Sequence, residues 1–310
     1  MRCVQPITIN GREMPCGRCP ACLRNRQNEW VFRLNEEMKV SPYSYFFTLT
    51  YRDSDLPVEL CDISLHSEIP TLCKRDVQLF LKRLRKNTCV KFKYHIVGEY
   101  GPDTLRPHYH GLIFSQSEFD IDDLLNAWQH QDLIYRVFEP CYGRSAVGYV
   151  TKYVCQIPFL PEHLKLLPRK YKPFTICSKG LGLTYLECNS SVVQKKLSQD
   201  EDFVIIDGKK MPMPRYYRNK LFPVSNGHKS SITRVFVGED YSQHLRMSLK
   251  RQELQNSIEE KRFKNYLFKN NLLDNDESRL RYEEYKKTLR KDCWRKAYKN
   301  SKYNLSKSKL

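Results

Sequence analysis

The chain has 310 residues, and its 53 lysines and arginines exceed its 35 acidic residues, so the net charge is +18 at pH 7. It contains no run of about 18 apolar residues, and its first ten residues lack the basic-then-apolar layout of a signal peptide, so we expect neither a membrane span nor export. The charge predicts an anionic partner, and the 20 tyrosines and 15 phenylalanines favour nucleic acid over a merely soluble basic surface.

Four cysteines lie near the N-terminus, at Cys3, Cys16, Cys19 and Cys22. The two-residue gaps allow thiolates to converge on one ion, and four thiolates complete a tetrahedral zinc site. The alternatives are four buried free thiols or an iron–sulfur cluster, although no companion redox signature is present. Because no export signal accompanies the chain's 12 cysteines, we expect most of them to be reduced.

The next stretch predicts a helix over 23–38, which shows one apolar stripe, and a central strand over 44–51 that is rich in aromatic and β-branched residues. Residues 52–71 contain acidic residues and prolines without sustained periodicity, so we expect a loop. A second helix over 72–86 follows, with apolar residues at helical spacing and a basic opposite side. That basic side is either a solvated surface or a contact for the DNA backbone.

Residues 91–100 and the segment that begins at 108 predict two strands joined by a loop that ends at Pro107. Because side chains alternate along a strand, His108 and His110 point to one face and Tyr109 to the other. Glu99 lies beside the turn on the paired strand. Two imidazoles and one carboxylate suit Mn²⁺ or Mg²⁺, whereas the alternatives are ordinary packed histidines and a surface carboxylate.

Further along, the pattern predicts a short helix over 120–130, a strand over 132–138 and a helix over 144–156. A four-residue step places Tyr149 and Tyr153 on one face of this last helix, with Lys152 on a neighbouring side. Tyrosines on a helix most often pack in a core, and that interpretation stays open here.

The remaining sequence predicts a loop over 173–186 and a hairpin over 203–213 with an Asp-Gly turn. Arg215 and Arg218, which flank two tyrosines, either grip a DNA strand or belong to a packed aromatic pair. From residue 241 to the end, 19 basic residues face 9 acidic ones, a net charge of +10, and the pattern predicts helices. The expected organisation is a cysteine-rich segment with a helix at 1–40, a core at 41–222 and a basic helical region at 223–310.

Three motifs in this order resemble the replication initiators of microviruses, most closely the gokushovirus type, which belong to the HUH endonucleases. They are Phe47-Thr48-Leu49-Thr50, His108-Tyr109-His110-Gly111 and the group Tyr149, Lys152 and Tyr153. The cysteine cluster and the Gly98-Glu99-Tyr100-Gly101 step are also similar to this group. The resemblance implies an α+β fold, in which helices pack on an antiparallel sheet.

The resemblance also implies an activity, namely a metal-dependent DNA endonuclease that can rejoin the strand it cuts. Tyr149 or Tyr153 would attack single-stranded origin DNA and keep the 5′ end, with Lys152 assisting, while His108, His110 and Glu99 hold the metal. Arg106, Arg215 and Arg218 are candidate DNA contacts. The implied partners are origin and supercoiled replicative-form DNA and a host helicase and polymerase, and the implied location is the host bacterial cytoplasm.

Two alternative functions follow from the same residues. One is a single-strand transposase or plasmid replication initiator of the same superfamily. The other, of a different class, is a non-catalytic nucleic-acid-binding protein that contains zinc.

Overall fold

A computed structural model describes most of the chain. The described residues are 3, 5–9, 12–62, 67–101, 104–118, 120–130, 137–140, 144–153, 164, 167–199, 201, 203–206, 208–221 and 241–307. They divide into two compact units, one built mainly from 20–184 and the other from 2–19 and 185–297.

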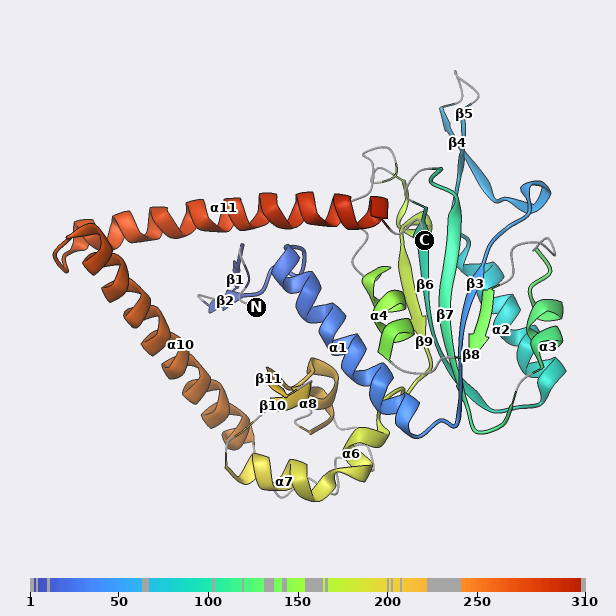
Figure 1. Cartoon of the computed structure of the whole chain (residues 1–310), viewed down its shortest axis with the longest axis horizontal. Coiled ribbons are helices and arrows are strands. Elements are labelled where there is room, and N and C mark those ends of the chain that lie inside the picture. The colour runs from blue at the N-terminus through green and yellow to red at the C-terminus, as the bar shows by residue number, and fades with distance from the viewer. Residues whose placement is uncertain are drawn as a thin grey trace. The chain divides into compact units, whose positions relative to one another are not determined.

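The first unit is built around a five-stranded antiparallel sheet with strand order β8-β3-β7-β6-β9, which confirms the expected α+β class. Its strands are β3 (Tyr43–Leu49), β6 (Phe92–Tyr100), β7 (Pro107–Ser115), β8 (Val137–Pro140) and β9 (Phe174–Cys177). Figure 1 shows helices on both sides of this sheet. They are α1 (Pro20–Lys39) and α4 (Arg144–Tyr153) on one side, and α2 (Lys74–Thr88) and α3 (Ile121–Ala127) on the other.

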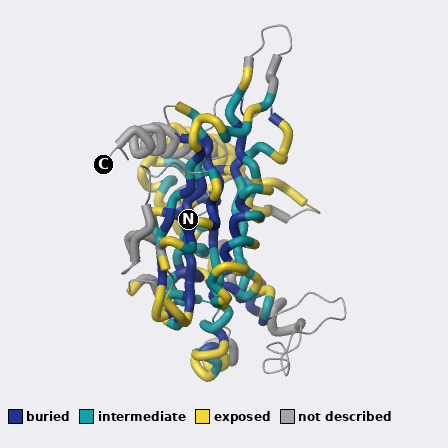
Figure 2. The backbone as a smooth tube through the Cα atoms, turned by 90° about the vertical axis from the view of Figure 1, so that its right-hand side faces the viewer, coloured by how far each residue is buried: buried dark blue, intermediate teal, exposed yellow. Residues whose placement is uncertain are grey.

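Alternating residues of the central strands form a separate core on each face of the sheet. Tyr109 and Ile113 pack with the apolar side of α2, whereas Leu112 and Phe114 pack with α1 and α4. Figure 2 shows the buried stretches of backbone concentrated in the strands. Burying each such side chain contributes about 1.5–3 kcal/mol. β7 is therefore rigid and has both faces covered.

Two predicted loops are wrong in part. Residues 52–71 contain a short 3-10 turn (Asp53–Asp55) and a hairpin of β4 (Val58–Asp62) and β5 (Ser67–Pro70). The predicted loop at 173–186 contains the edge strand β9 and the start of α6 (Thr184–Cys188), and it follows a second 3-10 turn at Arg169–Tyr171. β4, β5 and β9 have no alternating burial that a sequence pattern would reveal, and their strand pairing defines them.

The second unit contains two hairpins and several helices. The hairpins are β1 (Ile7–Ile9) with β2 (Arg12–Met14) and β10 (Phe203–Ile206) with β11 (Lys209–Pro212). The helices are α7 (Ser190–Ser198), α8 (Arg215–Leu221), α10 (Tyr241–Asn270) and α11 (Asp276–Lys307). Gly208 has a φ of +73°, in agreement with the expected glycine turn, while Asp207 lies outside the described residues.

The C-terminal region is helical, as expected, and α10 and α11 pack together through Phe263, Leu267 and Tyr282. None of the helices in the described part of the chain combines the length and hydrophobicity that a bilayer crossing requires. The boundaries at residues 40 and 222 stay predictions.

Candidate metal centre and tyrosine

The β6–β7 hairpin brings the predicted acid and histidines to one face of the sheet. Glu99 lies directly opposite His108 in the strand register, and His110 lies opposite Val97. The Glu99 carboxylate oxygen Oε1 is 2.8 Å from Nε2 of His110, and both residues are buried. Two of the three predicted ligands therefore meet.

Each imidazole is held through its other ring nitrogen. Nδ1 of His110 is 2.9 Å from the hydroxyl of Thr48 on β3, and Nδ1 of His108 donates to the carbonyl oxygen of Arg106 at 2.7 Å. The two rings lie parallel, with an interplanar angle of 4° and centroids 6.5 Å apart. Metal-binding histidines are commonly oriented by such a bond at one nitrogen, which leaves the other nitrogen for the ion.

The chemistry of the donor set fits a divalent ion. Burial, together with the neighbouring His110 and Arg106, lowers the pKa of His108 to about 4, so its imidazole is neutral at pH 7 and keeps a lone pair. Two neutral imidazoles and one carboxylate suit Mg²⁺ or Mn²⁺. In this structure, however, the donor atoms of the three residues do not all lie close enough together to form a closed metal group, because His108 stands apart from the Glu99–His110 pair.

Tyr149 lies against this pair. Its helix, α4, packs on the sheet through Val147 and Val150, so the next exposed position faces the hairpin. The Tyr149 ring meets the His110 ring edge-on, with centroids 5.5 Å apart and an angle of 87°, and it meets Phe46 in the same way. The side chain remains 38% exposed. The structure thus places the predicted tyrosine beside the predicted histidine.

Lys152 and Tyr153 occupy the last turn of α4, one turn after Tyr149. Their side chains lie outside the described residues, so their roles stay predictions.

The three arginines predicted to contact DNA are not brought together. Arg106 donates to the Asp53 carboxylate at 2.6 Å and to the carbonyl of Tyr51, so its guanidinium ties down the chain that leaves β3. In the second unit, Arg218 donates to the Met213 carbonyl at 3.0 Å, while Arg215 is exposed at the start of α8. Their contact with DNA stays a prediction.

Tyr109, between the two histidines, anchors the opposite face. Its hydroxyl accepts a hydrogen bond from the Cys73 amide at 2.8 Å, just before α2 begins, and lies 2.9 Å from the hydroxyl of Tyr51. Tyr51 in turn donates to Asp76 at 2.8 Å. Burial raises the pKa of both tyrosines, so both stay protonated and fix α2 to the strand that carries the histidines.

Gly111 follows the histidines because a larger residue would not fit. It lies opposite Phe47 in the register, and an added Cβ would be 2.1 Å from Cζ of that ring. The glycine therefore lets β3 and β7 pair with the Phe47 ring between them and the core. The glycine and Thr48 belong to the resembling motifs, but their structural roles could not be assigned from sequence.

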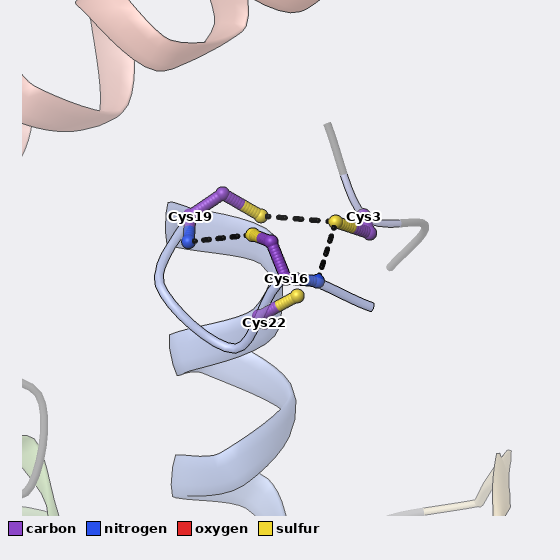
Figure 3. Close-up of side chains that lie close together, drawn as sticks. All are labelled: Cys3, Cys16, Cys19 and Cys22. Atoms are coloured by element: carbon purple, nitrogen blue, oxygen red, sulfur yellow. Dashed lines mark hydrogen bonds between the residues drawn. The ribbon is translucent and has the colours of Figure 1, made fainter. Parts of the chain in front are cut away.

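The four N-terminal cysteines form a cluster, as predicted (Figure 3). Their sulfur atoms all lie within 4.8 Å of one another, and Cys3 Sγ is 3.7 Å from Cys19 Sγ. Backbone amides donate to two of these sulfurs, from Cys16 to Cys3 and from Cys19 to Cys16, each at 3.3 Å. Such bonds stabilise thiolates, so the cluster could bind a metal such as zinc.

Among known proteins, the model for the family described as replication-associated protein ORF2 matches residues 44–157. The chain is 25% identical over 232 residues to the replication-associated protein ORF2 of Spiroplasma virus 4, which is 67% of each chain. It is 24% identical over 231 residues to the replication-associated protein VP4 of Bdellovibrio phage phiMH2K, or 66% of each chain.

The replication-associated protein ORF4 of Chlamydia phage 1 is 25% identical over 233 residues, which cover 67% of this chain and 53% of that protein. No solved structure matches the chain. The segment that the family model matches runs from β3 to just beyond α4 and contains Thr48, Glu99, both histidines and Tyr149. Through this segment, the chain belongs to the replication-associated protein ORF2 family and resembles the replication proteins of microviruses.

Proposed function

We propose that the chain initiates rolling-circle replication by cutting single-stranded DNA at a viral origin, holding the 5′ end as a phosphotyrosyl ester and rejoining it. The observation that carries this proposal is the edge-on contact of Tyr149 with His110, whose Nε2 lies 2.8 Å from the Glu99 carboxylate. A half-exposed tyrosine beside a buried imidazole and carboxylate is suited to attack on a phosphate.

The reaction exchanges one ester for another. The Tyr149 oxygen forms a bond to phosphorus, the bond from phosphorus to the 3′ oxygen breaks, the phenol loses its proton and the 3′ oxygen gains one. Because bond energy is largely conserved, the reverse step rejoins the strand. A divalent ion such as Mg²⁺ or Mn²⁺, held by His108, His110 and Glu99, would supply Lewis-acid activation of the phosphate.

Tyr149 needs help to react near neutral pH, because a free phenol has a pKa near ~10. Lys152, in the next turn of α4, is our candidate for favouring the ionised phenol or the charge on the phosphate. Tyr153 lies one turn after Tyr149, and we propose that the two tyrosines alternate, one holding the 5′ end while the other cuts the regenerated origin. Packing is the other role open to Tyr153.

The partners follow from this proposal. Origin DNA and supercoiled replicative-form DNA are the substrates, a host helicase and polymerase extend the 3′ end, and the host bacterial cytoplasm is the location. A single-strand transposase or plasmid initiator would use the same chemistry on different DNA ends.

We also propose that Cys3, Cys16, Cys19 and Cys22 hold a structural Zn²⁺. The amide-to-sulfur hydrogen bonds and the burial of Cys19 and Cys22 support this assignment. Zinc together with the +18 charge also suits a non-catalytic nucleic-acid-binding protein, which the following experiment separates from the initiator.

The protein is incubated with labelled single-stranded oligonucleotides that tile the encoding genome, with Mn²⁺ or with a chelator. We expect an adduct that resists boiling in detergent, requires the metal and disappears in Tyr149→Phe and His110→Ala. Equal losses in Tyr149→Phe and Tyr153→Phe support alternation, whereas a fully active Tyr153→Phe removes it. DNA binding without any adduct in the wild-type protein would favour the non-catalytic alternative.

A further inference from the structure

The outer side of α2 is uniformly basic. The helix buries Val77, Phe80, Leu81 and Leu84 against the sheet. Its exposed positions carry five cations and two amides: Lys74, Arg75, Gln78, Lys82, Arg85, Lys86 and Asn87. With 3.6 residues per turn, all five cations fall within about 120° of the helix circumference. Asp76, the acid of this helix, is turned inward to accept the hydrogen bond from Tyr51.

These charges are not balanced by neighbours. Within the described residues, none of the five cations forms an ion pair. Arg85 instead lies over the rings of Phe92 and Tyr94, with its guanidinium carbon 5.2 Å and 5.5 Å from their centroids. Those contacts leave its charge without an acidic partner and hold its position on the surface.

The arrangement also works against the stability of the helix. Lys74 and Arg75 occupy the first turn, where the helix dipole disfavours cations. Lys82 and Lys86 are four residues apart on the same side and repel each other. A surface that served only solubility would not need this pattern, whereas a bound polyanion would relieve both effects.

We propose that this basic stripe, defined as Lys74, Arg75, Lys82, Arg85 and Lys86, binds the phosphate backbone of DNA. From Arg75 to Lys86 the stripe rises about 16 Å along the helix, a length that corresponds to about five phosphates of one strand at ~3.4 Å each. An acidic membrane is a poorer partner, because the large apolar side chains of α2 are used against the sheet.

The stripe lies on the opposite side of the sheet from α4 (Figure 1). DNA on the stripe is therefore a different stretch from the one that meets Tyr149, and this inference goes beyond the proposed cutting reaction and does not depend on it. Such a surface would hold DNA beside the cut, either as duplex or as single strand.

The test measures binding by fluorescence anisotropy for the full-length triple variant Arg75→Gln/Lys82→Gln/Lys86→Gln. A labelled single strand and its duplex are titrated over a series of salt concentrations. We expect at least a tenfold lower affinity and a log–log salt slope smaller by about 2 to 3, since each lost phosphate contact removes ~0.7 to 0.9 of slope. The arm that loses affinity identifies the form of DNA bound.

The matched control is Lys264→Gln/Lys269→Gln/Lys287→Gln, which removes the same charge from exposed positions of α10 and α11. Unchanged affinity and slope on both DNA forms in the stripe variant, or equal losses in the control, would overturn the proposal. The stripe variant should melt no lower than wild type, because like-charge repulsion is removed. Lys82→Gln alone, with a slope change of about 1, gives the same test if the triple variant folds poorly.

Adduct formation on a saturating short single strand should be the same in the stripe variant and in wild type. If the wild-type protein forms no adduct, the proposed cutting reaction fails while the binding comparison remains readable.

Discussion

Thr48 is the residue that orients the buried ligand. Its hydroxyl lies 2.9 Å from Nδ1 of His110, on the side of the ring away from Glu99. We expect Thr48→Val, which keeps the shape of the side chain, to weaken metal activation about 10- to 100-fold. The measurement is the Mn²⁺ concentration that gives half-maximal adduct formation.

Thr50→Val is the control for this change, because Thr50 contributes its backbone carbonyl to Trp128 at 2.7 Å and a valine keeps that carbonyl. The assigned role of Thr48 would be wrong if both variants required the same Mn²⁺ concentration as wild type.

His95 makes stability depend on pH. The side chain is fully buried beside Trp30, and neither ring nitrogen has a hydrogen-bond partner within the described residues. Burial, assisted by the charge of Arg33, lowers its pKa from 6.5 to about 3. Because the unfolded chain binds this proton more readily, stability is complete above about pH 6.5 and should fall as the pH decreases, by about 1.4 kcal/mol per unit.

His95→Phe should remove this contribution and make the pH dependence shallower, while His108, whose pKa is lowered in the same direction, keeps its own. Denaturant titrations of both proteins at several pH values between 7 and 4, without added divalent metal, test this expectation. Parallel curves for variant and wild type would show that His95 does not titrate as inferred.

At the scale of elements, the cysteine cluster connects the segment before α1 to the first turn of that helix. We expect one zinc per chain by metal analysis, lost in Cys19→Ser and in Cys22→Ser and retained in Cys89→Ser, which changes an exposed thiol outside the cluster. Metal release should also lower thermal stability, because binding energy at a structural zinc site is folding energy. A metal-free wild-type protein with the same melting temperature would contradict the assignment.

Elements with strong periodicity were predictable from sequence. The stripe of α2 and the alternation of β7 determine one packed side each, so α2 and the histidine strand were expected close to their observed bounds. β4, β5 and β9 were not predictable, because they are short, have little burial contrast and become strands only through pairing with distant partners.

At the scale of the whole molecule, the sequence predicted which side chains belong to the candidate site but not how each is held. Strand alternation and the hairpin placed Glu99 and His110 together, and the helical step placed Tyr149 on an exposed side of α4. The contact of Thr48 with His110 and the anchoring of α2 by Tyr109 depend on strand order, which no local pattern contains.

The covalent link between the chain and DNA is the most direct test of the proposed function. The adduct formed with Mn²⁺ is digested with nuclease and protease, and the peptide that carries the nucleotide is sequenced by mass spectrometry. We expect a nucleotide 5′-phosphate on Tyr149, and also on Tyr153 if the two tyrosines alternate. A nucleotide on another residue, or cut DNA with free 5′ and 3′ ends and no modified peptide, would contradict attack by the tyrosine beside His110.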